Sequence, residues 1–256
     1  MSEGAGGRRF PLPRWAWALV GLAALIGAFA EAPRLLRRMD AFRVERVEVV
    51  GVRYLAPDAV IETAGIAEGS SIFDDPSPWR DALLAHPMVA DVRFGRRLPG
   101  TLVVEVVEVE PVALARTPEL VAVDAAARIL PVEPGRGELD LPVLAVRADV
   151  GADGRLSDAA AALVESYLRI RSQDAAIAAR ISELGPGLEE GGVRLILREP
   201  SGCEVLLAAG ADALRLAQLR LTLADLEAKA EAERVRRIDL RFRDQVVVSL
   251  DPGSRS

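Results

Sequence analysis

One stretch of this chain limits its fold more than any other, because it joins a turn, a long strand and a strand terminator. Residues 98–100 read Leu-Pro-Gly and favour a turn, since proline fixes φ and glycine tolerates positive φ. Residues 101–109 are mostly β-branched and are therefore predicted to form a strand. Valines occur on both of its faces, so we expect this strand to be central and largely buried. Pro111 cannot donate to a sheet ladder and ends it.

The residues before this strand predict a small α+β unit. In chain order, the predicted elements are a strand (42–51), a helix (57–65), a second helix (78–85) and two strands (89–94 and 101–109) that pair. Gly51 ends the first strand, and Gly65 is placed as a helix C-cap, where positive φ is required. The order is therefore strand, helix, helix, strand, strand.

The pattern changes after Pro111. Short apolar runs separated by Gly, Pro and Asp indicate a second domain with a mixed β-sheet and two helices. The helices are predicted over 157–172 and 212–232. In the second helix, apolar residues recur at steps of three and four: Leu216, Leu219, Leu223, Leu226 and Ala230. We expect this face to pack on the chain's own sheet, with a coiled-coil contact to a partner as the alternative.

The chain closes with two predicted strands, over 237–243 and 245–250. The first alternates strictly between apolar and charged residues, which is typical of a strand with one buried face. The apolar set expected to face the core is Ile238, Leu240 and Phe242. The charged set expected to face water is Arg237, Asp239, Arg241 and Arg243.

An uninterrupted apolar run occupies residues 15–30. At about 1.5 Å per residue it spans roughly 24 Å, slightly less than a hydrocarbon core of about 30 Å. We favour a single membrane anchor over 15–33, with a cleaved signal peptide ending at 28–30 and a buried core helix as alternatives. The anchor side chains would be Trp15, Trp17, Leu19, Leu22, Leu25, Ile26 and Phe29. Arginines flank the run on both sides, so charge does not decide its orientation.

The composition leaves little material for catalysis. The 256-residue chain has a net charge of −6, one histidine (His86) and one cysteine (Cys203). It therefore has no intramolecular disulfide and no Cys/His metal cluster, and a Ser-His-Asp triad would have to use His86. The sequence also lacks a phosphate-binding loop, His-Glu-x-x-His and Gly-x-Ser-x-Gly. We expect a non-enzymatic protein without a metal, cofactor, small-molecule substrate or nucleic-acid partner.

Several motifs, in the same order, resemble the FtsQ/DivIB family of bacterial cell-division proteins. They are Phe-x-Val-x-x-Val-x-Val-x-Gly (42–51), Gly-x-Ser-Ile-Phe (69–73), His-Pro-Met-Val-Ala-x-Val (86–92), Arg-x-x-Pro-x-x-Leu (96–102), Glu-x-x-Pro-Val-Ala (108–113), Leu-Pro-x-Leu (141–144) and Ile-Asp-Leu-Arg-Phe (238–242). The resemblance covers about residues 42–250. Phe242 stands where many family members have Tyr.

The resemblance implies an α+β protein with a single transmembrane helix, a POTRA domain of β-α-α-β-β order and an FtsQ-type β domain. The implied division is a cytoplasmic tail (1–14), the anchor (15–33), the POTRA domain (42–110), the β domain (111–251) and a tail (252–256). The implied function is a scaffold of the bacterial inner membrane, mostly periplasmic, at the division septum. Such a scaffold links divisome proteins and helps control septal peptidoglycan synthesis.

The partners implied by the resemblance are FtsB and FtsL, with FtsW or FtsI. Two other classes remain open on the sequence. One is a POTRA-containing protein-translocation or envelope-assembly component, which would need many amphipathic barrel strands after the POTRA domain. The other is a membrane-anchored cell-wall enzyme, which would need a nucleophile or paired acids in a cleft.

The candidate binding site is the last strand. If this strand lies at a sheet edge, its unpaired backbone groups can accept a strand from a partner, and the arginines beside it would favour an acidic partner. If it lies inside the sheet or is covered by the tail, no such site exists. The predicted contact residues are Arg237, Arg241, Phe242, Gln245, Val246, Val247, Val248, Ser249 and Leu250. Val247→Pro is expected to remove a backbone donor from this edge.

Overall fold

The computed structural model describes residues 39–132, 139–210, 212–242 and 244–251, together with Leu19, Leu22 and Leu36. The predicted tails (1–14 and 252–256) lie outside these residues. The predicted membrane anchor also lies outside them, except for Leu19 and Leu22, which are helical. Among the described residues, no helix combines the length and the apolar composition needed to cross a bilayer.

The described chain divides into two compact units. Two short segments from the first half of the chain belong to the second unit. The first unit holds the chain up to Val52, together with Ala56–His86 and Asp91–Val107. The second unit holds Arg53–Leu55, Pro87–Ala90 and the chain from Glu108 onward.

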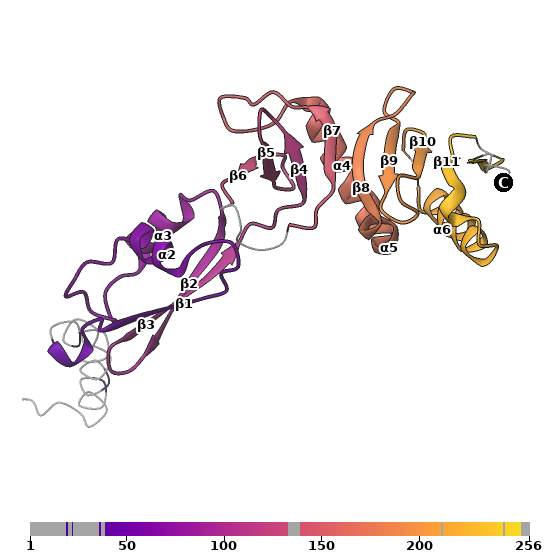
Figure 1. Ribbon diagram of the computed structural model, residues 1–256. Helices are drawn as coiled ribbons and strands as arrows, with labels where there is room; N and C mark the ends of the chain where they lie inside the picture. Colours follow the sequence, from indigo (N-terminus) through magenta and orange to yellow (C-terminus); the bar gives the residue numbers. More distant parts are fainter. Residues whose placement is uncertain are drawn as a thin grey trace, which may run out of the picture. The chain divides into compact units, whose positions relative to one another are not determined.

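A three-stranded sheet and two helices form the first unit. After a 3₁₀ turn (η1, Asp40–Phe42), its elements are β1 (Arg46–Val50), α2 (Pro57–Ala64), α3 (Ser77–Leu84), β2 (Val89–Arg97) and β3 (Thr101–Glu108) (Figure 1). The predicted order of strand, helix, helix, strand and strand is confirmed. Gly65 caps α2 with φ of 63°, as predicted.

The strand β3 lies at the centre of this sheet, between β1 and β2, and runs parallel to β1. Leu102, Val104 and Val106 are buried on one of its faces. The predicted central position is confirmed, but Val107, on the opposite face, is 45% exposed, so the strand is fully buried on one face only. The reason is that α2 and α3 lie together on one side of the sheet, and neither of these helices covers the other side (Figure 1).

Gly51 ends β1 in a conformation that other residues rarely adopt. Its φ is 85°, and an added Cβ would lie 2.3 Å from the carbonyl oxygen of Val106. Positive φ and a backbone closer than van der Waals contact both exclude a side chain here. The predicted strand end at Gly51 therefore has a steric cause in the neighbouring β3.

The Glu108 carboxylate fixes a loop at the start of the second unit. It accepts hydrogen bonds from the backbone N–H groups of Arg53, Tyr54 and Leu55, at 2.7 to 3.1 Å. Three successive N–H groups around one carboxylate satisfy donors that no strand or helix uses. Glu108 is the first residue of the Glu-x-x-Pro motif, and this contact gives that motif a structural role.

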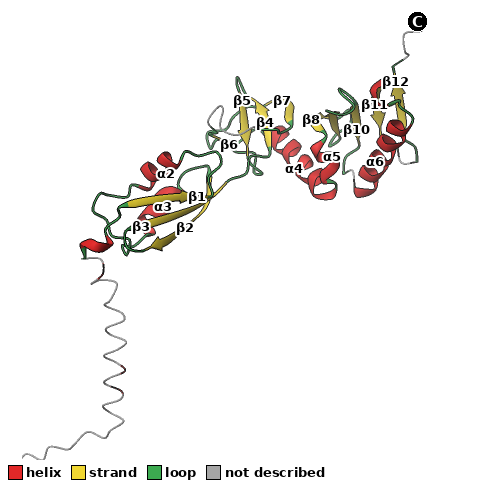
Figure 2. Ribbon diagram, turned by 60° about the horizontal axis from the view of Figure 1, so that its bottom comes forward, coloured by secondary structure: helices red, strands yellow, loops and turns green. Residues whose placement is uncertain are grey.

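The second unit is built on a nine-stranded mixed sheet with the order β12-β11-β10-β9-β8-β7-β4-β5-β6. Its strands are β4 (Ala113–Arg116), β5 (Leu120–Val123), β6 (Ile129–Leu130), β7 (Val143–Arg147), β8 (Ile181–Pro186), β9 (Val193–Leu197), β10 (Glu204–Leu207), β11 (Val235–Asp239) and β12 (Val247–Leu250). Its helices are α4 (Asp158–Gln173), α5 (Ala175–Ala179) and α6 (Ala213–Ala228), with a 3₁₀ turn, η2 (Ala232–Arg234). The three α-helices lie along one face of the sheet (Figure 2).

The helix α5 corrects the expectation of two helices in this domain. Asp174 caps it by accepting a hydrogen bond from the N–H of Ile177 at 3.1 Å. The same buried carboxylate accepts a hydrogen bond from Arg220 of α6 at 2.9 Å. A five-residue helix is too short to show helical periodicity in sequence, and it persists because its cap is paired across the fold.

Candidate functional site at the β12 edge

The last strand, β12, lies at one end of the nine-stranded sheet. It pairs antiparallel with β11, with Asp239 opposite Val247, Ile238 opposite Val248 and Arg237 opposite Ser249. Among the described residues, no strand pairs with its outer side. The strand is therefore at the edge of the sheet and not inside it, while the tail (252–256), which was considered from the sequence as a cover for this edge, lies outside the described residues.

The direction of the backbone groups on β12 follows from two hydrogen bonds. The N–H of Leu240 donates to Leu206 of β10 at 2.9 Å, so the groups of Asp239 and Arg237 point the other way, toward β12. The N–H of Asp251 donates to the carbonyl oxygen of Arg234 at 2.7 Å, so the backbone groups of Asp251 point inward, toward β11. Backbone direction alternates along a strand, so those of Ser249 and Val247 point inward as well.

Val247 and Ser249 therefore use their N–H and C=O groups inside the sheet, opposite Asp239 and Arg237. Val248 and Leu250 direct theirs to the free edge. The expectation that proline at 247 removes an edge donor is accordingly wrong, since that donor belongs to the internal ladder. The edge donors belong to Val248 and Leu250.

The side chains of β12 separate into an inner and an outer face. Val246, Val248 and Leu250 are half-buried and pack on the main core of the second unit. Val247 and Ser249 are exposed. A strand added at this edge would cover the partly exposed apolar side chains of the inner face while pairing with the free backbone groups.

The strand β11 ends earlier than predicted, at Asp239 rather than at residue 243. Asp239 is only 7% exposed, and its carboxylate accepts hydrogen bonds from the backbone N–H of Arg241 at 3.0 Å and from the Nη2 of Arg241 at 2.6 Å. This short-range contact closes the strand, because it takes the N–H that a longer strand would have used for pairing. The expectation that Asp239 faces water is wrong.

Asp239 and Arg241 form an ion pair that determines the electrostatics of this turn. Hydrogen bonding to the Arg241 side chain holds the pKa of Asp239 below its usual value, against the opposing effect of burial. Arg241 also forms an ion pair with Glu189 at 3.3 Å, and its side chain is 21% exposed. Arg241 is thus held between two carboxylates and is not a freely solvated cation.

Phe242 lies on the surface, with 45% of its area exposed. The expectation that it faces the core is wrong, because the chain leaves the strand geometry after Asp239. The Arg241 guanidinium lies 5.8 Å from the centre of its ring, within the range of a cation–π contact. Phe242 therefore offers an exposed aromatic surface in the connection between β11 and β12.

The arginine side chains here are less available than the sequence suggests. Arg237 is exposed as predicted, and its Nε donates to Glu204 of β10 at 2.5 Å. Arg243 lies outside the described residues. Glu189 and Glu204 were not identified from the sequence, because they lie 52 and 33 positions from their partners and no local pattern links them.

No cluster of His, Cys, Asp and Glu among the described residues has the geometry to hold a metal ion. Cys203 is buried, and burial raises the pKa of its thiol to about 11, with a further contribution from Glu204. Within the described residues, this site consists of the unpaired outer side of β12 and the exposed Phe242 in the β11–β12 connection.

Comparison with known proteins agrees with this fold. A family model described as "POTRA domain, FtsQ-type" matches residues 42–108, which include the β1-α2-α3-β2-β3 unit. The chain is therefore a POTRA-bearing protein of the FtsQ type. The comparisons of the whole chain identify the family more closely.

The chain is 30% identical over 211 residues to the cell division protein FtsQ of Myxococcus fulvus, covering 79% of this chain and 71% of that protein. It is 29% identical over 245 residues to the FtsQ of Anaeromyxobacter sp. (strain K), covering 93% and 81%. A third relative, the FtsQ of Geotalea daltonii, is 25% identical over 242 residues, covering 90% and 85%. The chain belongs to the family of the cell division protein FtsQ.

Proposed function

We propose that this protein is a non-enzymatic scaffold of the bacterial divisome, anchored in the inner membrane by residues 15–33. The bulk of the chain, from about residue 42, would lie in the periplasm at the septum. The proposed division is a POTRA domain (42–110) that recruits and contacts division proteins and a β domain (111–251) that binds a partner through β12. The scaffold would help control septal peptidoglycan synthesis by linking its partners.

The observation that carries this proposal is the free edge of β12 in a chain of the FtsQ family. A partner strand would pair with the outward groups of Val248 and Leu250 and would contact Phe242 and the exposed Val247. The proposed partner is an FtsB-like protein acting with FtsL, and further contacts to FtsW or FtsI would involve other surfaces. Gln245, Val246 and Ser249 complete the proposed contact set with Arg237 and Arg241.

The site would prefer an acidic partner because a partner carboxylate can replace a carboxylate of this chain as the ion-pair partner of an arginine. Arg237 and Arg241 already have carboxylate partners in Glu204, Asp239 and Glu189. The Arg241–Glu189 pair is the longest of these contacts, at 3.3 Å, and Glu189 is 56% exposed. A partner carboxylate would therefore compete with Glu189 more readily than with the buried Asp239.

The test is calorimetric binding of the full-length protein in neutral detergent to a peptide from the periplasmic part of the cognate FtsB-like protein. Val248→Pro removes an outward donor while leaving the inward ladder of Val247 and Ser249 in place. We expect it to weaken binding by about tenfold or more, through the lost hydrogen bond and the steric effect of the ring. Val248→Ala, which keeps the N–H, is the matched control and should bind within about threefold of wild type.

Circular dichroism and the melting temperature establish that each variant is folded. Equal binding by Val248→Pro and wild type would show that the peptide does not pair with this edge. If wild type does not bind the peptide at all, docking at β12 is excluded, while membership of the FtsQ family is unaffected.

A further inference from the structure

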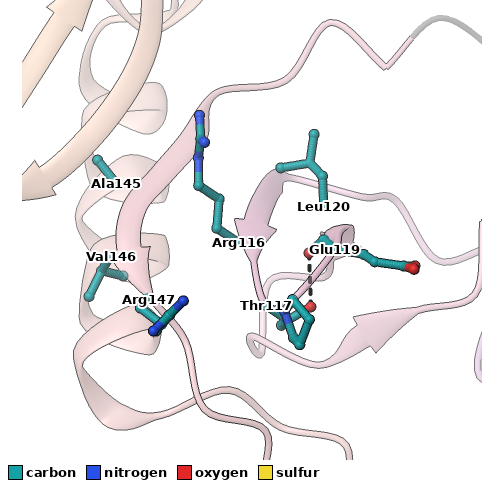
Figure 3. A pocket seen from close by; sticks show the side chains of 8 residues that line it. Arg116, Thr117, Glu119, Leu120, Ala145, Val146 and Arg147 are labelled. Carbon is teal, nitrogen blue, oxygen red and sulfur yellow. Dashed lines mark hydrogen bonds between the residues drawn. The ribbon is translucent and has the colours of Figure 1, made fainter.

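A second surface feature lies far along the sheet from β12. It is an open groove of about 460 Å³ at the carboxyl ends of the parallel strands β4 and β7. Residues of both strands and of the β4–β5 turn line it (Figure 3). Four strands, β8 to β11, separate β7 from β12 in the sheet order, so this groove is distinct from the proposed β12 site.

The groove carries two arginines that face each other in the strand register, Arg116 of β4 and Arg147 of β7. Both are exposed, and within the described part of the chain neither forms an ion pair with a carboxylate. Most other arginines of this unit are paired, as with Arg194 and Arg237 on Glu204. Like charges on neighbouring strands are unfavourable, and although Glu119 also lines the groove, no ion pair among the described residues relieves this arginine pair.

The two guanidinium groups do not converge on one point. Figure 3 shows the Arg116 side chain running between β7 and Leu120, whereas Arg147 lies at the end of β7 and points elsewhere. Glu119 points away from Arg116 in the same view. Separated cations suit a ligand with several spaced carboxylates better than one small anion, which would need both groups around it.

The groove also offers preformed apolar surface. Leu120 is 55% exposed at its rim, and Val146 is half-buried within its lining. The turn between β4 and β5 is fixed, because the Oγ1 and the backbone N–H of Thr117 both donate to the carbonyl of Glu119, at 2.8 and 3.0 Å. A fixed turn reduces the entropy that a ligand must overcome on binding.

We propose that this groove binds an acidic, extended segment of a partner protein. Carboxylates of that segment pair with Arg116 and Arg147, and an apolar side chain between them contacts Leu120 and Val146. The chain as a whole carries a charge of −6, so a local pair of unopposed cations directs such a segment to this surface. The proposal does not depend on the β12 edge.

The test is fluorescence anisotropy with the full-length protein in neutral detergent. The probe is a short fluorescein-labelled peptide in which Glu alternates with Ser and Leu, and the control peptide has Gln in place of every Glu. We expect Arg116→Gln/Arg147→Gln to weaken binding of the acidic peptide by about fivefold to tenfold. Added salt should weaken the wild-type interaction as well.

A second pair of arginines provides the matched control. Arg128 and Arg155 face each other in an isolated β-bridge and are exposed, and among the described residues their guanidinium groups form no ion pair with a carboxylate. Arg128→Gln/Arg155→Gln therefore removes the same charge elsewhere and should change binding by less than about twofold. The loss of binding caused by Arg116→Gln/Arg147→Gln should be the same in a Val248→Pro background, which separates this proposal from the one for β12.

Three results would overturn the proposal. Equal weakening by both double variants would indicate non-specific attraction to the overall charge. Equal binding of the Gln peptide would exclude recognition of carboxylates. Inorganic phosphate is added as a competitor of the peptide. Displacement of the peptide by low concentrations of phosphate would show that the groove binds small anions and not a peptide segment.

Discussion

Asp239 acts on the candidate site through its neighbours in the chain. Its carboxylate binds both the backbone and the side chain of Arg241, ends β11 and turns Phe242 to the surface. A buried carboxylate is stable here because Arg241 supplies several donors to it. The exposed aromatic residue beside β12 thus depends on one short-range ionic contact.

Asp239→Asn should destabilise the protein by about 1 to 3 kcal/mol at pH 7, because it removes the charge that Arg241 binds. The pKa of Asp239 lies below its usual value, so the ionised group stabilises the fold above pH 4 or so, and this contribution is lost as the pH falls through the folded-state pKa. Urea unfolding of both proteins at several pH values measures the difference, which should shrink in acid. Asp244→Asn, at an exposed residue of the same turn, is the control. A difference that grows in acid would contradict this assignment.

At the scale of elements, α6 shows how sequence periodicity maps onto burial. Leu216, Leu219, Leu223 and Leu226 are buried, as predicted from their spacing. Ala230, the last residue of the predicted set, lies beyond the helix end with φ of 55° and is exposed. The helix ends at Ala228, so the pattern was extended one step too far.

Two leucines of α6 should respond very differently to truncation. Leu219 is fully buried, and Leu219→Ala should lower the free energy of unfolding by about 2 to 5 kcal/mol through lost burial and the resulting cavity. Leu221 is 70% exposed, and Leu221→Ala should change the free energy of unfolding by less than about 0.5 kcal/mol. Urea denaturation followed by circular dichroism makes the comparison. Similar losses from the two variants would mean that the outer face of α6 is covered in solution.

At the scale of the whole molecule, the single cysteine reports on the integrity of the second unit. Cys203 is buried in the main core, and burial raises the pKa of its thiol to about 11. The thiolate is the reactive form, so a buried, protonated thiol resists modification at pH 8.

We expect a maleimide to label the folded protein slowly at pH 8 and to label it rapidly in urea, following the unfolding transition. Since the chain has one cysteine, the extent of labelling is read directly by mass spectrometry. When reclosing is faster than the maleimide reaction, Leu219→Ala should accelerate labelling by the factor that corresponds to its loss of unfolding free energy. Rapid labelling of the folded wild type would contradict the burial of Cys203.

The sequence alone determined the elements whose signals are local. The turn at 98–100, the Gly65 cap and the leucine spacing of α6 each depend on residues a few positions apart, and each is predicted from the sequence and present in the structure. The family could be identified from the sequence for a related reason, because its motifs occur in a fixed order along the chain.

The tertiary structure decided which surfaces are free. That β12 is an edge, that its outward donors belong to Val248 and Leu250, and that Arg237 pairs with Glu204 all depend on which strands become neighbours. The unpaired arginines of the β4–β7 groove emerge in the same way. Strand pairing joins residues tens of positions apart through the free energy of the whole sheet, so no short pattern contains that information.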